Sequence, residues 1–296
     1  ARSRTMSDVR CVVEAKALIC ESAVWDDRYH FVYWLDIDGK KLHRYDPASN
    51  HDDAWDLPGR AGALALRAIG GVVLAMEHGF YGFDFMDPRP QLIASLDGIP
   101  ATTRLNDGRA DPAGRFWSGT VNNAAREPTG AMFCLDTDGT ASRKFGGIDI
   151  SNALCWSPDG KTMYHTDSFT WKIQAYEFDA ATGTVSNPRV FVDIPRDEEG
   201  FADGATVDAD GCLWAAHWGR GRVKRYDPAG TLMQTVQLPV TNITCPCFGG
   251  PDLTTLYITT ARFRLTDEQA AQQPLAGGLF AIETDVKGQV ERRYEG

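Results

Sequence analysis

The chain has 296 residues, more than most single domains, and 43% of them are hydrophobic, which is enough for a sizeable core. Its net charge of −10 argues against a nucleic-acid partner, because proteins that bind nucleic acids present a basic surface that displaces counterions. No apolar run approaches the length that spans a bilayer, so no membrane partner is expected.

The N-terminal residues and the cysteines bear on processing and on the compartment. Residues 1–7 carry charge with no apolar stretch behind it, so we expect a disordered leader or a cloning remnant outside the fold. The seven cysteines are an odd number, mostly in apolar runs, without the C-x-x-C pairs of zinc sites. Reduced thiols and a cytoplasmic location are therefore expected.

Short runs rich in Val, Tyr, Trp, Phe and Thr alternate with Asp, Gly and Pro turns along the whole chain. The unit at 21–36 reads polar residue, apolar strand, tight turn, second apolar strand and Asp, and the unit at 152–167 aligns with it without a gap. Such units recur at intervals of about 40 to 50 residues. In chain order they begin at Glu21, Gly62, Asn106, Asn152, Asp203 and Cys245.

Each unit also contains a second hairpin signal, which brings its strand count to four. Four strands at this period are typical of a β-propeller, and six units account for nearly the whole chain. We therefore predict an all-β fold, a six-bladed β-propeller with four antiparallel strands per blade, formed by residues 8–296 as one domain. The competing fold, an irregular β-sandwich, does not predict a four-stranded unit repeated six times.

The segment before the first unit has a predicted role in closing the propeller. An open strand edge invites aggregation, so propellers usually pair an early strand with the last blade. The predicted closing strand is Arg10-Cys-Val-Val-Glu14.

The first residues of the units are predicted to form a ring, because the innermost strand of each blade begins near the axis. Four of the six carry side-chain oxygens, namely Glu21, Asn106, Asn152 and Asp203. Each of them alone is typical of a turn. Carboxylates that converge in a channel repel one another, however, unless a proton or a cation compensates. This oxygen-rich set predicts one divalent metal ion, with Ca²⁺, Mg²⁺ or Mn²⁺ favoured and Fe²⁺ or Zn²⁺ as further options.

Several motifs follow one another along nearly the full length of the chain. They are Glu21-Ser22, Arg104-Leu-Asn106-Asp-Gly108, Ser151-Asn152-Ala, Ala202-Asp203-Gly204 and Cys247-Phe-Gly-Gly-Pro251. In order and spacing they resemble the SMP-30/gluconolactonase family, which includes regucalcin and bacterial sugar lactonases, and residues 274–280 are similar to bacterial aldonolactonases. The resemblance implies a six-bladed propeller that binds one divalent ion and hydrolyses lactones of sugar acids.

The resemblance also implies which residues form the site. It places the metal ligands on Glu21, Asn152 and Asp203, and two substrate contacts on Arg104 and Asn106.

Two departures from the family pattern concern the same site. In the loop where some relatives carry a substrate-binding Glu, we predict Asn122 and Glu127 as substrate-binding residues, with Asn123 as an alternative. The usual glycine after the second metal ligand is Ala153 here, which we interpret as a mild change because alanine still lets neighbours pack closely.

The function hypothesis is metal-dependent hydrolysis of a sugar-acid lactone, such as a pentonolactone or hexonolactone, to the free aldonic acid. In this hypothesis the metal polarises the lactone carbonyl, and either Asp203 acts as general base or a metal-bound water is the nucleophile. The alternatives are a metal-dependent esterase or organophosphate hydrolase and a non-enzymatic calcium-binding propeller. We expect a monomer or a weak oligomer.

Overall fold

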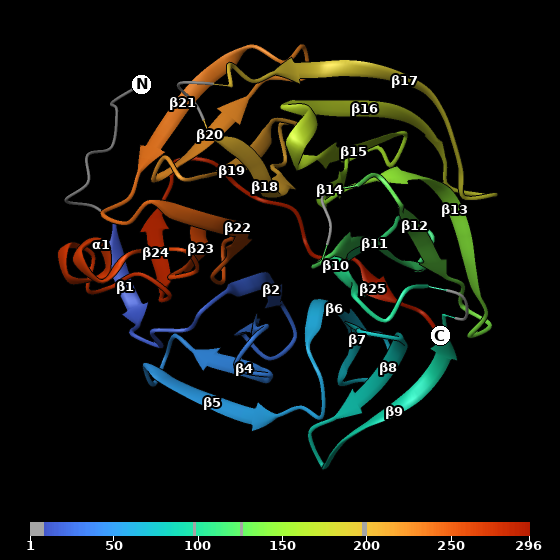
Figure 1. The fold of residues 1–296 in the computed structure, drawn as a ribbon, viewed down its shortest axis with the longest axis horizontal. Coiled ribbons are helices and arrows are strands. Elements are labelled where there is room, and N and C mark those ends of the chain that lie inside the picture. Colours follow the sequence, from blue (N-terminus) through green and yellow to red (C-terminus); the bar gives the residue numbers. More distant parts are fainter. Residues whose placement is uncertain (1–8, 97–98, 125–126, 197–199) are drawn as a thin grey trace.

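A computed structural model describes residues 9–96, 99–124, 127–196 and 200–296 of the chain. Six sheets of antiparallel strands surround a central axis as the blades of a β-propeller (Figure 1). The predicted fold class is confirmed. The leader predicted at residues 1–7 lies outside the described residues.

Within each blade the strands run outward from the axis in chain order, except in the last blade. Blade 1 contains β2 (Cys20–Asp26), β3 (Phe31–Asp36), β4 (Lys41–Asp46) and β5 (His51–Asp56). Blade 2 contains β6 (Ala61–Arg67), β7 (Val72–Met76), β8 (Gly79–Asp84) and β9 (Asp87–Ser95). Blade 3 contains β10 (Thr103–Ala110), β11 (Phe116–Asn122), β12 (Gly130–Leu135) and β13 (Ala141–Ile148).

The second half of the chain forms the other three blades. Blade 4 contains β14 (Ser151–Trp156), β15 (Thr162–Asp167), β16 (Lys172–Asp179) and β17 (Thr184–Asp193). Blade 5 contains β18 (Phe201–Val207), β19 (Leu213–Trp218), β20 (Arg222–Tyr226) and β21 (Leu232–Gln237). Blade 6 contains β22 (Asn242–Gly249), β23 (Thr255–Ala261), β24 (Leu279–Glu283) and β1 (Arg10–Val13). The connections include a 3-10 turn η2 (Ser168–Thr170) and a short helix α1 (Asp267–Gln272).

Blade 6 is completed by the N-terminal strand. β1 pairs with β24 in antiparallel fashion, with Arg10 opposite Ala281, and forms the outer edge of the sheet. The predicted closing strand is thus confirmed. Because the first strand of the chain completes the sheet of the last blade, blades 1 and 6 cannot separate without breaking this pairing.

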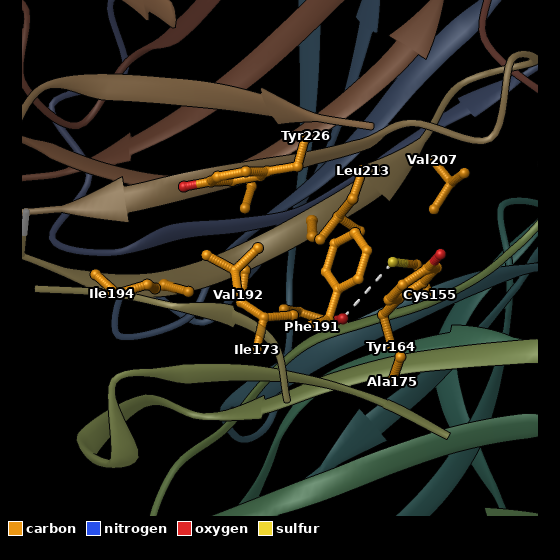
Figure 2. Packing of buried hydrophobic residues seen from close by; sticks show 14 residues of the cluster. Cys155, Tyr164, Ile173, Ala175, Phe191, Val192, Ile194, Val207, Leu213 and Tyr226 are labelled. Carbon is orange, nitrogen blue, oxygen red and sulfur yellow. Dashed lines mark hydrogen bonds between the residues drawn. The ribbon is translucent and has the colours of Figure 1, made fainter. Parts of the chain in front are cut away.

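The hydrophobic core consists of six clusters, one between each pair of neighbouring blades. Figure 2 shows the cluster between blades 4 and 5, in which Tyr164 shares the interface with Leu213 and Tyr226. Both faces of every blade are therefore buried, which explains the apolar inner strands. Each large apolar side chain that is fully buried contributes roughly 1.5–3 kcal/mol, so the clusters hold the axis residues of adjacent blades in fixed relative positions.

Each of the six inner strands contains a one-residue bulge at the level of the predicted ring. The pairing of β2 with β3 shifts between Glu21 and Val24, and β14 shifts at the equivalent place after Asn152. Bulges re-aim side chains, and here they lie where each strand approaches the axis. The predicted gap-free equivalence of Glu21 and Asn152 is confirmed.

The predicted alignment of Asp203 and Asn106 with Glu21 is wrong by one residue. In β18 and β10 the last paired positions before the bulge are Ala202 and Leu105, so Asp203 and Asn106 are themselves the first bulged residues. The same bulged position after Glu21 and Asn152 has left-handed backbone, with φ of 55° at Ser22 and at Ala153. A non-glycine residue in this conformation costs roughly 1–2 kcal/mol of stability. Replacing the usual glycine by Ala153 is therefore a larger change than the mild one predicted.

The C-terminal tail crosses the axis at the end of the propeller where the inner strands finish, as the red trace in Figure 1 shows. Gly288 bridges to Asp208 of blade 5, and β25 (Arg293–Tyr294) pairs in parallel with β6 of blade 2. Arg293 also donates to Asp26 of blade 1, with the two side chains 2.8 Å apart. The tail therefore joins blades on opposite sides of the ring and covers the base of the channel.

Among the described residues, no helix has both the length and the apolarity that crossing a bilayer requires. All seven cysteines of the chain are free thiols, and six of them are buried.

Candidate active site

A cavity of about 360 Å³ opens on the axis at the end of the propeller opposite the C-terminal tail, where the inner strands begin. This volume suits one small ligand. Residues from all six blades line it, and five of the seven predicted site residues are among them: Glu21, Arg104, Asn106, Asn152 and Asp203.

Two buried carboxylates lie together at the base of the cavity. Glu21 is 5% exposed and Asp203 is 6% exposed, and their side chains form a hydrogen bond with each other. Burial, and then the negative charge of Asp107, raise the pKa of Glu21 to about 8. Burial and the charge of Glu21 raise the pKa of Asp203 well above its ordinary value. A second carboxylate this close is tolerated when the pair binds a proton or a cation.

Two other buried aspartates of the repeat show the contrasting, structural arrangement. Asp111 accepts hydrogen bonds from Trp117 Nε1 and Arg115 Nε, at 2.8 and 2.6 Å. Asp208 accepts equivalent bonds from Trp214 Nε1 and Arg225 Nε, at 2.9 and 2.8 Å. These aspartates are neutralised within their own blades, whereas Glu21 and Asp203 face each other across the axis.

The side-chain amide of Asn152 is held by neighbours on both sides. Its Nδ2 donates to Ser168 Oγ at 2.9 Å, and that hydroxyl donates to the carbonyl of Ala202 at 2.8 Å. Its Oδ1 accepts from Asn106 Nδ2 at 3.1 Å. Because Nδ2 is committed to Ser168, the amide oxygen is the atom that Asn152 offers to a ligand in the cavity.

Arg104 brings a positive charge to the same cavity. Its Nη1 donates to Asn106 Oδ1 at 2.6 Å and to the carbonyl of Leu105 at 3.0 Å. Burial, and then the charge of Arg60, lower the pKa of Arg104 to about 10, so the side chain is still a cation at neutral pH. Its Nε is buried without a hydrogen-bond partner among the described residues. A buried donor without a partner is costly, and a polar ligand would satisfy it.

The donor set fits a divalent cation. Glu21 and Asp203 supply carboxylate oxygens and Asn152 an amide oxygen, which are the ligands that hard cations prefer. Within the described ranges, no group of three or more His, Cys, Asp and Glu residues has a metal-binding arrangement, and the set here includes an amide instead. A cation would also compensate the two buried charges, which otherwise favour protonation.

The predicted loop residues lie elsewhere. Asn122 is buried, but its Oδ1 accepts from the backbone N–H of Ala124 at 3.0 Å, and it does not line the cavity. Glu127 is exposed and also lies outside the lining. The neighbouring Asn123 does line it. The roles of Asn122 and Glu127 in substrate binding stay predictions.

A polar column continues along the axis below the carboxylate pair, and sequence reasoning missed it. Asp107 is buried and accepts from the backbone N–H groups of Gly108 and Leu154, at 2.9 and 2.8 Å. Arg109 lies 3.5 Å from Glu291 of the C-terminal tail. Asp107 follows the ring residue Asn106 directly, so its place near the axis could have been predicted from the sequence. Nothing in the repeat predicts that Glu291 lies on the axis.

A second ring of side chains surrounds the cavity above the first, and it was also missed. Arg60 stands two residues before Gly62, as Arg104 stands two before Asn106 and Phe201 two before Asp203. All three line the cavity. The position two residues before each ring residue could therefore have been used to predict Arg60 and Phe201 as lining residues. Arg60 Nε bonds to Glu77 at 2.9 Å, and its Nη1 lies 3.8 Å from Asp38, which also lines the cavity.

Gly62 is required by close packing at the ring. A Cβ there would collide with the carbonyl oxygen of Leu105 and lie 2.8 Å from the Cα of Asn106. We therefore expect Gly62→Ala to displace β10, together with Arg104, and to lower kcat/KM for any substrate by at least about tenfold. Steady-state kinetics and thermal unfolding check this. In the control Gly82→Ala, the one tight contact of the new Cβ is with the flexible end of Arg67, at 3.0 Å, so equal losses in both variants would contradict the prediction.

The fold and the cavity together define a class of protein: a six-bladed propeller with an axial small-ligand site whose oxygen donors suit a divalent cation. The chain belongs to the family described as SMP-30/Gluconolactonase/LRE-like region, whose model matches residues 19–262. The predicted resemblance is thus confirmed.

Individual relatives match over almost their whole length. Regucalcin from Xenopus laevis is 38% identical over 280 residues, which cover 93% of each chain. Among solved structures, the calcium-binding protein regucalcin from Agrobacterium tumefaciens is 32% identical, with a TM-score of 0.93 and 97% of each chain covered. A luciferin-regenerating enzyme is 28% identical, with a TM-score of 0.89, covering 97% of this chain and 99% of its own.

Proposed function

We propose that this chain is a metal-dependent lactonase, which hydrolyses the lactone of a sugar acid to the free aldonic acid. The observation that carries the proposal is the meeting of Glu21, Asn152 and Asp203 in a cavity where Arg104 presents an unpartnered donor. The family name, which includes gluconolactonase, supports the reaction class.

Glu21, Asn152 and Asp203 would hold one divalent ion, Ca²⁺, Mg²⁺, Mn²⁺, Zn²⁺ or Fe²⁺. Such an ion supplies Lewis acidity at the lactone carbonyl and leaves room for substrate, because three protein ligands do not fill its coordination sphere. Arg104 orients the substrate by donating to its oxygens. Asn106 Nδ2 donates to Ser151 and Asn152. Asn106 therefore contributes its Oδ1, which accepts from Arg104 and from a substrate hydroxyl.

Asp203 is the proposed general base. It takes a proton from the water that attacks the carbonyl carbon, and the bond between that carbon and the ring oxygen then breaks. The proton passes to the departing ring oxygen, which becomes a hydroxyl of the product. The carboxylic acid formed ionises at neutral pH, so each turnover releases one proton to solvent.

A calcium-binding propeller without catalytic activity is the second candidate, because the related Agrobacterium structure is named a calcium-binding protein. The two candidates differ at Arg104: a buried cation whose Nε donor has no partner among the described residues, close to the ligand set, serves no purpose in binding calcium alone. A metal-dependent esterase would use the same residues on a different substrate.

The test is proton release from a panel of aldonolactones, followed with a pH indicator. Chelator-treated protein is compared with the same protein after addition of Mg²⁺, Ca²⁺, Mn²⁺, Zn²⁺ or anaerobic Fe²⁺, and the spontaneous rate is subtracted. We expect metal-dependent acceleration of at least one pentonolactone or hexonolactone. A folded protein that binds metal, shown by a higher melting temperature, but accelerates no lactone would contradict the proposal. Turnover of aryl esters alone would favour the esterase.

A further inference from the structure

Four aromatic side chains line one side of the cavity. They are Phe169 after blade 4 strand β15, Phe201 and Trp218 of blade 5, and Phe263 after blade 6 strand β23. Neighbours in this aromatic arc touch: the ring centroids of Phe169 and Phe201 are 5.4 Å apart, those of Phe201 and Trp218 6.2 Å, and those of Trp218 and Phe263 6.5 Å. The planes of Phe201 and Trp218 are within 10° of parallel.

The arc is not part of the hydrophobic core. Its four members are partly exposed, whereas Trp25, Trp156 and Trp214 at the inner-blade positions of the repeat are buried between blades. Partly exposed aromatic rings that touch one another inside a polar cavity leave apolar surface in water, and such surface marks a binding site.

Most of the charged and amide side chains outside the donor set of Glu21, Asn152 and Asp203 lie on the other half of the ring. Asp38, Arg60, Arg104, Asn106 and Asn123 come from blades 1–3, and Figure 1 shows β2, β6 and β10 of these blades opposite β14, β18 and β22 of blades 4–6. The aromatic half also contains Asn152 and Asp203 of the donor set and Arg264, whose guanidinium lies 5.2 Å from the centroid of the Phe263 ring.

A ligand that fits both halves has an apolar face and a polar edge. A sugar-lactone ring has both, because its C–H bonds are exposed on the faces of the ring while its hydroxyls and carbonyl project from the rim. An open-chain sugar acid rotates freely about its bonds and presents no fixed face of this kind.

We propose that Phe201 and Trp218 form a stacking platform for the C–H face of a cyclic sugar lactone, whose hydroxyls face the polar half of the cavity. The proposal rests on the proposed function and deepens it, because it makes the closed ring the recognised feature. Substrate is then bound more tightly than the open-chain product, which assists product release.

The test compares Trp218→Ala, Trp218→Leu and Trp218→Phe with wild type in the metal-loaded protein. With gluconolactone as substrate, we expect the alanine and leucine variants to raise KM about tenfold and change kcat less than about threefold, while phenylalanine stays near wild type. Trp171→Ala is the matched control, because Trp171 contacts Phe169, at 5.8 Å between centroids, but does not line the cavity. Its KM should stay at the wild-type value.

Binding of two probes separates ring stacking from general damage. Both affinities are measured by isothermal titration. The affinity for gluconolactam, the stable ring analogue, should weaken about tenfold in Trp218→Ala, whereas the affinity for open-chain gluconate should not change. Equal weakening for both probes, an unchanged KM, or a fall in kcat alone would overturn the platform. If wild type hydrolyses no lactone but binds the lactam in a Trp218-dependent way, the proposed function fails and the platform stands. If lactones are hydrolysed and KM is insensitive to Trp218, the platform fails and the proposed function stands.

Discussion

Replacing Asp203 by asparagine should lower kcat for lactone hydrolysis by about 10²- to 10⁴-fold. The amide has the shape of the carboxylate, so the packing of the side chain is preserved, but it cannot take a proton from water. The loss should appear in kcat more than in KM, because the proposed substrate contacts Arg104 and Asn106 are unchanged. Stopped-flow or steady-state proton release with gluconolactone measures the effect.

The same variant separates two roles of Asp203. Metal affinity, measured by titration against the melting temperature, should also fall, because one of the two proposed carboxylate ligands is lost. Recovery of wild-type kcat at saturating metal would show that Asp203 is a ligand only and that a metal-bound water starts the attack. Asp210→Asn is the control in the same blade: the side chain of Asp210 is 74% exposed, and its substitution should change neither quantity.

Metal should stabilise the protein more strongly as the pH rises. In the metal-free folded protein the pKa of Glu21 is raised from 4.5 to about 8, chiefly by burial. Between these values the folded state holds a proton that the unfolded chain releases, so the stability from this group is complete below the lower value and is lost as the pH rises through about 8. Metal requires ionised ligands, so its binding releases protons and tightens over the same window.

Thermal unfolding with and without metal at about pH 5.5, 7 and 8.5 tests this linkage. The metal-induced rise in melting temperature should be largest at the highest pH. Glu21→Gln should abolish most of that rise. Without metal, wild type should lose stability relative to Glu21→Gln as the pH increases. A metal effect independent of pH, or metal-free wild type that gains stability over Glu21→Gln with rising pH, would contradict the assignment.

The blades and most of the site could be predicted because they depend on a local, repeated pattern. Alternating apolar strands and tight turns specify each four-stranded sheet, and a short apolar strand before the first unit closes the ring. Closure then brings the start of every inner strand to the axis. This explains why Glu21, Asn152 and Asp203, far apart in the chain, could be assigned to one cavity before any contact was known.

The amino-acid sequence by itself determined the number of blades, the closing strand and the identity of the axial oxygen donors, because each follows from a local pattern in the repeat units or in the short segment before them. Only the tertiary structure decided that Asp203 is bulged where Glu21 is paired, that Asn123 rather than Asn122 lines the cavity, and that Phe201 and Trp218 face the polar half of blades 1–3. It also decided that Glu291 reaches Arg109 on the axis. The physical reason is common to these features. A bulge shifts the pairing by one residue without altering the apolar pattern, and contacts between blades or with the tail depend on how sheets pack after the ring has closed.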